Sequence, residues 1–257
     1  MVRLREHFWR DREREEQYTY LERRRDVRVS RTGKVSLGPS RTFEVYPSSV
    51  PGRTYKRLIE VEGVPLPPAE LARRDAEHRG NMLWEKRRRE DQTPQQQADR
   101  ERHDRERRDR QRREVEEAFG VFDVTPAGVE RLEGRAEPVL RVSLLPRRDA
   151  PAHSDLVRYL KRFEGTAWVD TAAGQLVRLD LRAVEDVTVG WGLVGRVHKG
   201  STASYERQLV DGDAWLPWRA RLSVRGRALL FRKFDIETET TWWDYRKYSV
   251  ETRVIGP

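Results

Sequence analysis

The glycine-rich run GWGLVG at residues 190–195, with His198, Lys199 and Ser201 just after it, comes nearest in residue type and spacing to a catalytic or phosphate-binding motif. A phosphate-binding loop ends in Lys followed by Ser or Thr and lies between a strand and a helix, and this run has neither property. His198 with Lys199 and Ser201 could belong to a hydrolase site, but no nucleophile-elbow motif accompanies them, and a histidine in a polar loop is more often structural. We therefore predict no catalytic residue and expect a protein that is not an enzyme.

Metal and thiol chemistry are also disfavoured by the composition. The five histidines are scattered, without a pair at metal-ligand spacing. The chain contains no Cys, which excludes disulfides, thiol nucleophiles and thiolate metal sites. We predict neither a metal site nor a cofactor.

Nucleic-acid binding is suggested by the net charge of +9 and by two tryptophan pairs, Trp215/Trp218 and Trp242/Trp243, that could stack bases. However, the positive charge is spread evenly along the chain, whereas a phosphate-binding surface concentrates it. The charged segment 68–120 carries 15 basic and 14 acidic side chains, a net charge of +1, which is typical of a solvated helical surface. We expect no nucleic-acid partner, and keep binding through Arg-rich surfaces as the weakest alternative.

The stretch from Phe163 to Tyr248 alternates between apolar and polar side chains, and the rest of the chain is organised around it. Successive side chains of a strand point to opposite sides, so this alternation predicts an antiparallel sheet with one apolar and one wet face. The positions assigned to the apolar face are Leu179, Leu181, Ala183, Trp218, Ala220, Leu222, Val224, Leu230, Phe234, Ile236, Thr238, Thr240 and Trp242. That face must be covered, either by the protein's own helices or by something that the protein binds.

The N-terminal part of the chain reads as a helix followed by three strands. Residues 1–17 form the helix, with Leu4 and Phe8 as its docking stripe. The strands are YTYLERRRDVRV, SRTFEVYP and TYKRLIEVEGVPL, with a turn at residues 31–34 and a hairpin or bulge at Glu62-Gly63.

A charged helical segment follows at residues 68–120. Pro67-Pro68 start a helix whose early part could dock through Leu71, Met82, Leu83 and Trp84. Residues 85–113 cannot bury an apolar face, so we predict a projecting helical hairpin that breaks at 93–97 and returns to the body at Val115, Ala118 and Phe119.

Two further strands and a short helix lead into the long sheet. The strands lie in FGVFDVTPAGVERLEG and PVLRVSLLPRRD. In the helix SDLVRYLKRF, Ser154 is the expected N-cap and Leu156, Val157 and Leu160 are expected to turn inward.

No membrane span or export signal is recognisable in the chain. It has no run of about 18 apolar residues that would cross a bilayer. The first residues, MVRLREHFWRDREREEQ, lack the apolar core of a signal peptide. These observations fit either a cytosolic protein or a sequence from which an export signal is omitted.

The pattern YTYLERR…RTFEVYP…YKRLIEVEGVPLPPAEL, followed by FEGTAWVD…VRLDLR…VGWGLVGRVHKGS…WLPWRARLSVRGRALLFRKF…DYRKY, resembles bacterial exported proteins of the outer-membrane lipoprotein-sorting type. These proteins share the fold of the periplasmic lipoprotein carriers (LolA/LolB-like) and of the related anti-sigma-factor regulator domain. The resemblance runs from about Tyr18 to Tyr248, and its motifs are typical of a branch apart from the well-studied carriers.

The resemblance implies an α+β fold: a strongly curved, unclosed antiparallel sheet (a half-barrel) whose concave apolar face is covered by helices. Residues 1–257 would form a single domain that contains 68–120 as a charged helical insertion. The space between sheet and helices would receive a lipid or lipoprotein acyl chain. The residues that would line it are Trp168, Leu179, Leu181, Trp218, Leu222, Phe234 and Trp242, although the face on which Trp168 lies is not set by the pattern.

The leading hypothesis is therefore a monomeric, non-enzymatic binding protein of the periplasm or cell envelope, compatible with peripheral contact to a membrane and with an envelope protein as partner. The alternative is an envelope protein-interaction or sensor module. In that case the core would be filled by the protein's own side chains, and the charged helical hairpin would be its docking arm.

Overall fold

The structure is a computed structural model that describes residues 2–32, 34–47, 54–135, 137–189, 195–228 and 232–248. Four α-helices and thirteen β-strands occur in these residues. The helices are α1 (Val2–Glu15), α2 (Pro68–Glu90), α3 (Pro94–Gly120) and α4 (Asp155–Leu160). The strands are β1 (Tyr18–Val29), β2 (Val35–Pro47), β3 (Thr54–Val61), β4 (Val64–Pro65), β5 (Phe122–Glu130), β6 (Val139–Pro146), β7 (Phe163–Asp170), β8 (Gln175–Ala183), β9 (Val187–Val189), β10 (Gly195–Val197), β11 (Thr202–Val210), β12 (Ala214–Ala228) and β13 (Arg232–Lys247).

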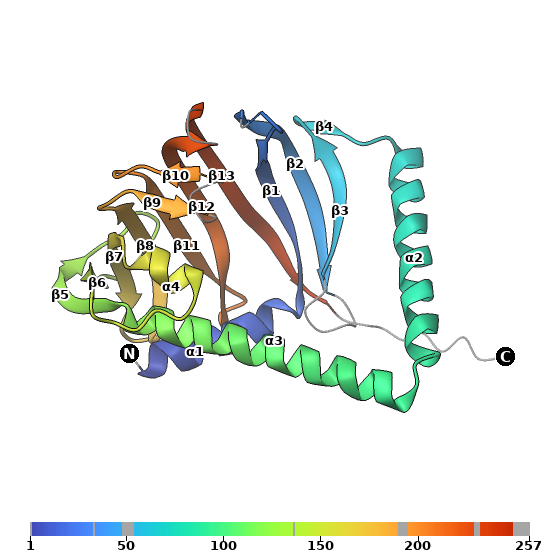
Figure 1. The fold of residues 1–257 in the computed structure, drawn as a ribbon, viewed down its shortest axis with the longest axis horizontal. Coiled ribbons are helices and arrows are strands. Elements are labelled where there is room, and N and C mark those ends of the chain that lie inside the picture. The colour runs from blue at the N-terminus through green and yellow to red at the C-terminus, as the bar shows by residue number, and fades with distance from the viewer. Residues whose placement is uncertain are drawn as a thin grey trace.

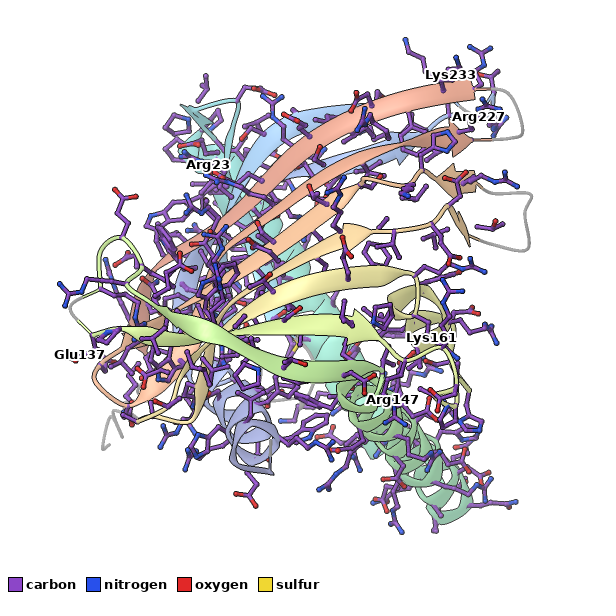
Figure 2. The ribbon with its side chains drawn as sticks, turned by 90° about the vertical axis from the view of Figure 1, so that its left-hand side faces the viewer. Arg23, Glu137, Arg147, Lys161, Arg227 and Lys233 are labelled. Atoms are coloured by element: carbon purple, nitrogen blue, oxygen red, sulfur yellow. The ribbon has the colours of Figure 1, made fainter. Side chains whose placement is uncertain are left out.

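All thirteen strands belong to one antiparallel sheet that does not close on itself. Their order is β4-β3-β2-β1-β13-β12-β11-β8-β7-β6-β5, with β9 and β10 attached beside β12. Figure 1 shows the sheet bending from β5 at one end to β3 at the other. Figure 2 shows it from the β5 side, with Arg227 and Lys233 at one end of the strands and Glu137 at the opposite end. The predicted α+β class with an open antiparallel sheet is confirmed.

The two faces of the sheet follow from the pairing, because directly paired residues of neighbouring strands point to the same side. We define the apolar face by two such rows: Val142, Ala167, Leu179, Tyr205, Ala220 and Thr240, and Leu144, Gly165, Leu181, Ala203, Leu222 and Thr238. The opposite face, the charged face, carries Arg178, Asp180, Arg182, Glu206, Arg219, Arg221, Glu237 and Glu239. The alternation predicted over this part of the chain is therefore confirmed for β8 and most of β12 and β13.

Helices α2 and α3 run from one end of the sheet to the other, because they connect β4 with β5 (Figure 1). Local chemistry sets their limits. Glu62 and Gly63 make the β3–β4 turn with positive φ angles of 51° and 79°, as the sequence predicted. Thr93 accepts a hydrogen bond from the backbone N–H of Gln96, and its own N–H donates to the Gln96 side chain. This capping box, with Pro94 as the first helical residue, places the break at residues 91–93, slightly before the predicted 93–97.

Several predicted local features are confirmed. Ser154 accepts a hydrogen bond from the backbone N–H of Val157, and Val157 is fully buried. The Phe119 ring contacts Phe8 of α1 edge-on, so α3 does return to the body there. The first helix spans Val2–Glu15 rather than 1–17.

Three apolar residues that were predicted to point inward do not. Leu83 and Trp84 of α2 are 58% and 59% exposed, because the side of α2 that faces the sheet carries Asp75 and His78 instead. Leu156 of α4 is 42% exposed. Gly33 of the predicted turn, Leu230 of the apolar pattern and residues 190–194 of the glycine-rich run lie outside the described residues.

Candidate apolar binding site

The apolar face is well covered at both ends of its strands. Near α1, Leu216 and Val45 are fully buried and Tyr20 is 7% exposed. Toward the opposite strand ends, Ala183 is fully buried and Ile236 is 6% exposed. These residues form ordinary core, which fixes the shape of the surface between them.

The middle of the same face is only partly covered. Leu222, at the centre of β12, is 38% exposed. Leu179, Leu181, Phe234 and Trp242 are half-buried. Aliphatic side chains of a central strand are normally buried, so this part of the sheet offers apolar surface that the described helices leave accessible. We take Leu179, Leu181, Leu222, Phe234 and Trp242 as the candidate site.

The leucines of the site continue a packed cluster on the neighbouring strands. Val142, Leu144 and Ala167 are buried, and Leu179 and Leu181 pack against them. The floor of the site is therefore rigid on the β6–β8 side.

Phe234 occupies its place because the residue opposite it is a glycine. A Cβ at Gly226 would lie 2.6 Å from the Phe234 ring and 2.3 Å from the carbonyl oxygen of Arg196. No other residue fits between the ring and that backbone. Gly226 thus allows the aromatic ring to lie across β12.

Trp242 lies where the apolar face meets a charged group. Its Nε1 donates to Glu22 Oε2 at 3.2 Å. The Glu22 carboxylate, almost fully buried, also accepts from Lys56 Nζ at 2.6 Å and from Arg24 at 3.0 Å. Burying a carboxylate is costly unless it is paired, and these three donors provide the pairing.

Two of the seven predicted lining residues lie elsewhere. Trp168 pairs with Arg178 and Arg141, so it points to the charged face; it is 8% exposed, and its Nε1 donates to Glu130. Trp218 is skipped by the pairing, because Glu206 pairs with Arg219 and Arg207 pairs with Pro217. It is 40% exposed, with the Arg219 guanidinium over its ring at 4.3 Å. Pro217, which cannot donate to a ladder, was the available signal for this bulge.

Helix α1 closes one end of the apolar face through groups that the sequence reasoning missed. Asp11 Oδ2 accepts from Arg207 at 2.7 Å, and both side chains are buried. Arg207 also donates to Gln175 at 3.2 Å. Glu15, four residues after Asp11, accepts from the Tyr20 hydroxyl at 3.4 Å. Arg207 lies 196 residues from Asp11 and 32 residues from Gln175, so no local pattern could reveal these two contacts.

Burial shifts the pKa values of the ionisable side chains at this end of the apolar face. Burial raises the pKa of Glu15, and the Tyr20 hydrogen bond offsets this only in part. Burial also raises the pKa of Tyr205 to about 12, and raises those of Tyr20 and Tyr245 further. Tyr245 donates its hydroxyl hydrogen to the carbonyl oxygen of Pro217 at 2.8 Å. These tyrosines remain neutral and act as part of the wall.

A hollow of about 940 Å³ is lined by charged-face residues, Ser143, Thr166 and Ser204 among them, and also by Leu181 and Leu222. Its charged side chains largely neutralise one another: Arg178 with Asp180 at 2.7 Å and Arg221 with Glu239 at 2.5 Å. We interpret this hollow as a solvated sheet surface.

The residues that came nearest to hydrolytic chemistry do not assemble into a catalytic pair. His198 Nδ1 lies 3.2 Å from Asp186 Oδ2, but the Ser201 hydroxyl donates to the backbone carbonyl of His198 at 2.8 Å rather than to its ring. The backbone N–H of Lys199 is the main reason that the pKa of Asp186 is lowered. In the part of the chain that the structure describes, no group of three or more acidic, His or Cys side chains could hold a metal ion. Nor does any helix among those residues have the length and apolar character to cross a membrane.

Comparison with known proteins adds no identification: no protein-family model, curated protein or solved structure matches the chain.

Proposed function

We propose that this chain is a non-enzymatic binding protein of the cell envelope that holds a lipid or lipoprotein acyl chain against the apolar face. The observation that carries the proposal is the partly open centre of that face, where Leu222 is 38% exposed between two fully buried ends. In this proposal the open sheet is a LolA-like half-barrel, and residues 68–120 are an insertion that extends its covering helices.

The binding force would be desolvation. Each methylene that leaves water contributes about 0.8 kcal/mol, so an acyl chain of ordinary length needs no specific polar contact. The buried Glu22 carboxylate and its donors stand at one border of the site. A chain lying along Leu179, Leu181 and Leu222 therefore has its polar end directed away from the β1 side or out to solvent.

The first test is native mass spectrometry of the purified protein, followed by organic extraction of co-purifying molecules. We expect a bound fatty acid or phospholipid, or uptake of a fluorescent fatty acid. Leu222→Asp should weaken uptake about tenfold or more, because it places a carboxylate against the chain.

Leu145→Asp is the matched control. Leu145 is 52% exposed and follows the apolar-face residue Leu144, so it points to the charged face. It should leave uptake unchanged, with circular dichroism confirming that both variants fold. An apo mass with no uptake, or equal loss in both variants, would contradict the proposal.

The alternative function is an envelope protein-interaction module with α2 and α3 as its docking arm. Its specific support is that neither helix contains a buried residue among those the structure describes. In that case the Leu222→Asp variant keeps its partners and deletion of the arm loses them.

A further inference from the structure

The outer side of α2 carries two large apolar side chains that no part of the described protein covers. Leu83 and Trp84 are 58% and 59% exposed, whereas Asp75 and His78 on the other side of the helix contact Arg57 and Tyr55 of β3. A tryptophan exposed to this degree beside an exposed leucine is unusual on a helix that is otherwise charged.

Four cations follow these two residues within the next turn and a half of α2. They are Lys86, Arg87, Arg88 and Arg89. The Arg88 guanidinium lies 5.3 Å from the centre of the Trp84 ring, so cation and aromatic ring share one side of the helix. Lys86 is 3.9 Å from Glu90.

Helix α3 shows what an ordinary solvated charged helix looks like in the same protein. There Arg102 pairs with Asp99 at 2.9 Å and Arg107 with Asp104 at 3.3 Å, and no large apolar residue accompanies them. The α2 segment therefore differs from α3 in one respect: its cations stand beside exposed apolar groups. Glu85, Glu90 and Asp91 lie close by and reduce the net charge of the segment to a small positive value.

The segment is also placed where a flat surface can reach it. Figure 1 shows α2 standing outside the β3 end of the sheet, with its C-terminal end at the corner where α3 begins. Bilayer interfaces attract tryptophan and leucine at the level of the headgroups and attract Lys and Arg through anionic lipids. A nucleic acid would use the cations but would leave Leu83 without a partner.

We propose that Leu83, Trp84 and the Lys86–Arg89 run of α2 form a docking surface for an anionic lipid bilayer. The surface lies outside the acyl-chain site, so it goes beyond the proposed function and can be true or false independently of it. Binding is reversible and falls with ionic strength, because much of the attraction comes from the four cations.

The test is sedimentation of the full-length protein with vesicles of phosphatidylglycerol and phosphatidylethanolamine, compared with vesicles of phosphatidylcholine alone. We expect binding to the anionic vesicles only. Replacing Lys86, Arg87, Arg88 and Arg89 by Gln should weaken it about tenfold or more. Leu83→Ser with Trp84→Ser should weaken it several-fold and remove the blue shift of tryptophan emission on binding.

The matched control replaces four arginines of α3 by Gln: Arg105, Arg107, Arg108 and Arg110. It should retain vesicle binding, and Leu222→Asp should also retain it while losing fatty-acid uptake. Equal loss in the α2 and α3 charge variants, equal binding to neutral vesicles, or binding to a DNA duplex in place of vesicles would overturn the proposal.

Discussion

Helices α1 and α2 are both tied to the sheet by an aspartate that contacts an arginine, but the two ties lie in opposite surroundings. Asp11 of α1 meets Arg207 of β11 at 2.7 Å, with side chains 2% and 7% exposed. Asp75 of α2 receives Nε and Nη2 of Arg57 of β3, both at 2.9 Å, and these side chains are each 25% exposed.

This difference in burial indicates which helix is the more firmly fixed to the sheet. A buried ion pair contributes little net stability, but losing one partner leaves the other charge buried and unpaired, which is costly. A partly exposed pair can exchange its partner for water at small cost. Helix α1, which closes the apolar face, is therefore held much more strictly than α2, which carries the proposed membrane surface.

The largest effect is expected from Asp11→Ala. It leaves the Arg207 guanidinium buried with only neutral acceptors, and should lower the free energy of unfolding by about 3–5 kcal/mol. Urea unfolding followed by circular dichroism measures this. The double variant Asp11→Leu with Arg207→Met should recover much of the loss, since it removes both charges. A single variant as stable as the wild type would show that α1 is held by its apolar contacts alone.

The second largest effect is expected in the pH dependence of stability, through Glu15 of α1. Burial raises the pKa of Glu15, so the folded state favours the protonated carboxyl. The contribution of Glu15 to stability is therefore most favourable below the ordinary carboxyl pKa and declines as pH rises through the raised pKa. Glu15→Gln should remove this decline and increase the melting temperature at neutral pH. Glu16→Gln, one residue later and exposed, is the control and should leave the pH profile unchanged.

The two-faced sheet could be predicted because its signal is local and repeated. Alternation at period two marks β8 and most of β12 and β13, and the Glu62-Gly63 and Ser154 positions carry their own turn and cap chemistry. Within the candidate site, Leu179, Leu181 and Leu222 followed directly from that pattern.

The remaining parts depend on partners distant in sequence. Asp11 and Arg207 are 196 residues apart, and charged residues on a short helix normally indicate solvent, so their burial had no local signal. Trp218 was misplaced because it is the extra residue of a bulge between Pro217 and Arg219, which strict alternation cannot represent. Leu83 and Trp84 were assigned to packing because apolar residues usually pack, whereas the sheet-facing side of α2 carries polar groups.

The smallest and most local effect is expected from Asp75→Asn at α2. Hydrogen bonds from Arg57, more than from Tyr55, lower the pKa of Asp75. The contribution of ionised Asp75 to holding α2 against β3 is therefore present above the ordinary aspartate pKa. It is lost as pH falls through the lowered pKa, which is the reverse of the Glu15 trend. Acid should thus loosen α2 under conditions in which α1 is held best.

Hydrogen exchange of the α2 backbone amides measures this effect without requiring global unfolding. Asp75→Asn should speed their exchange at neutral pH. It should leave the melting temperature nearly unchanged, since the contacts of Asp75 with Arg57 and of His78 with Tyr55 are partly solvated. Glu77→Gln is the matched control, because Glu77 pairs with the exposed Arg73 of the same helix. Unchanged exchange in Asp75→Asn would mean that the stacking of His78 on Tyr55, with ring centres 3.7 Å apart, holds α2 by itself. That result would remove the contrast between the two helices.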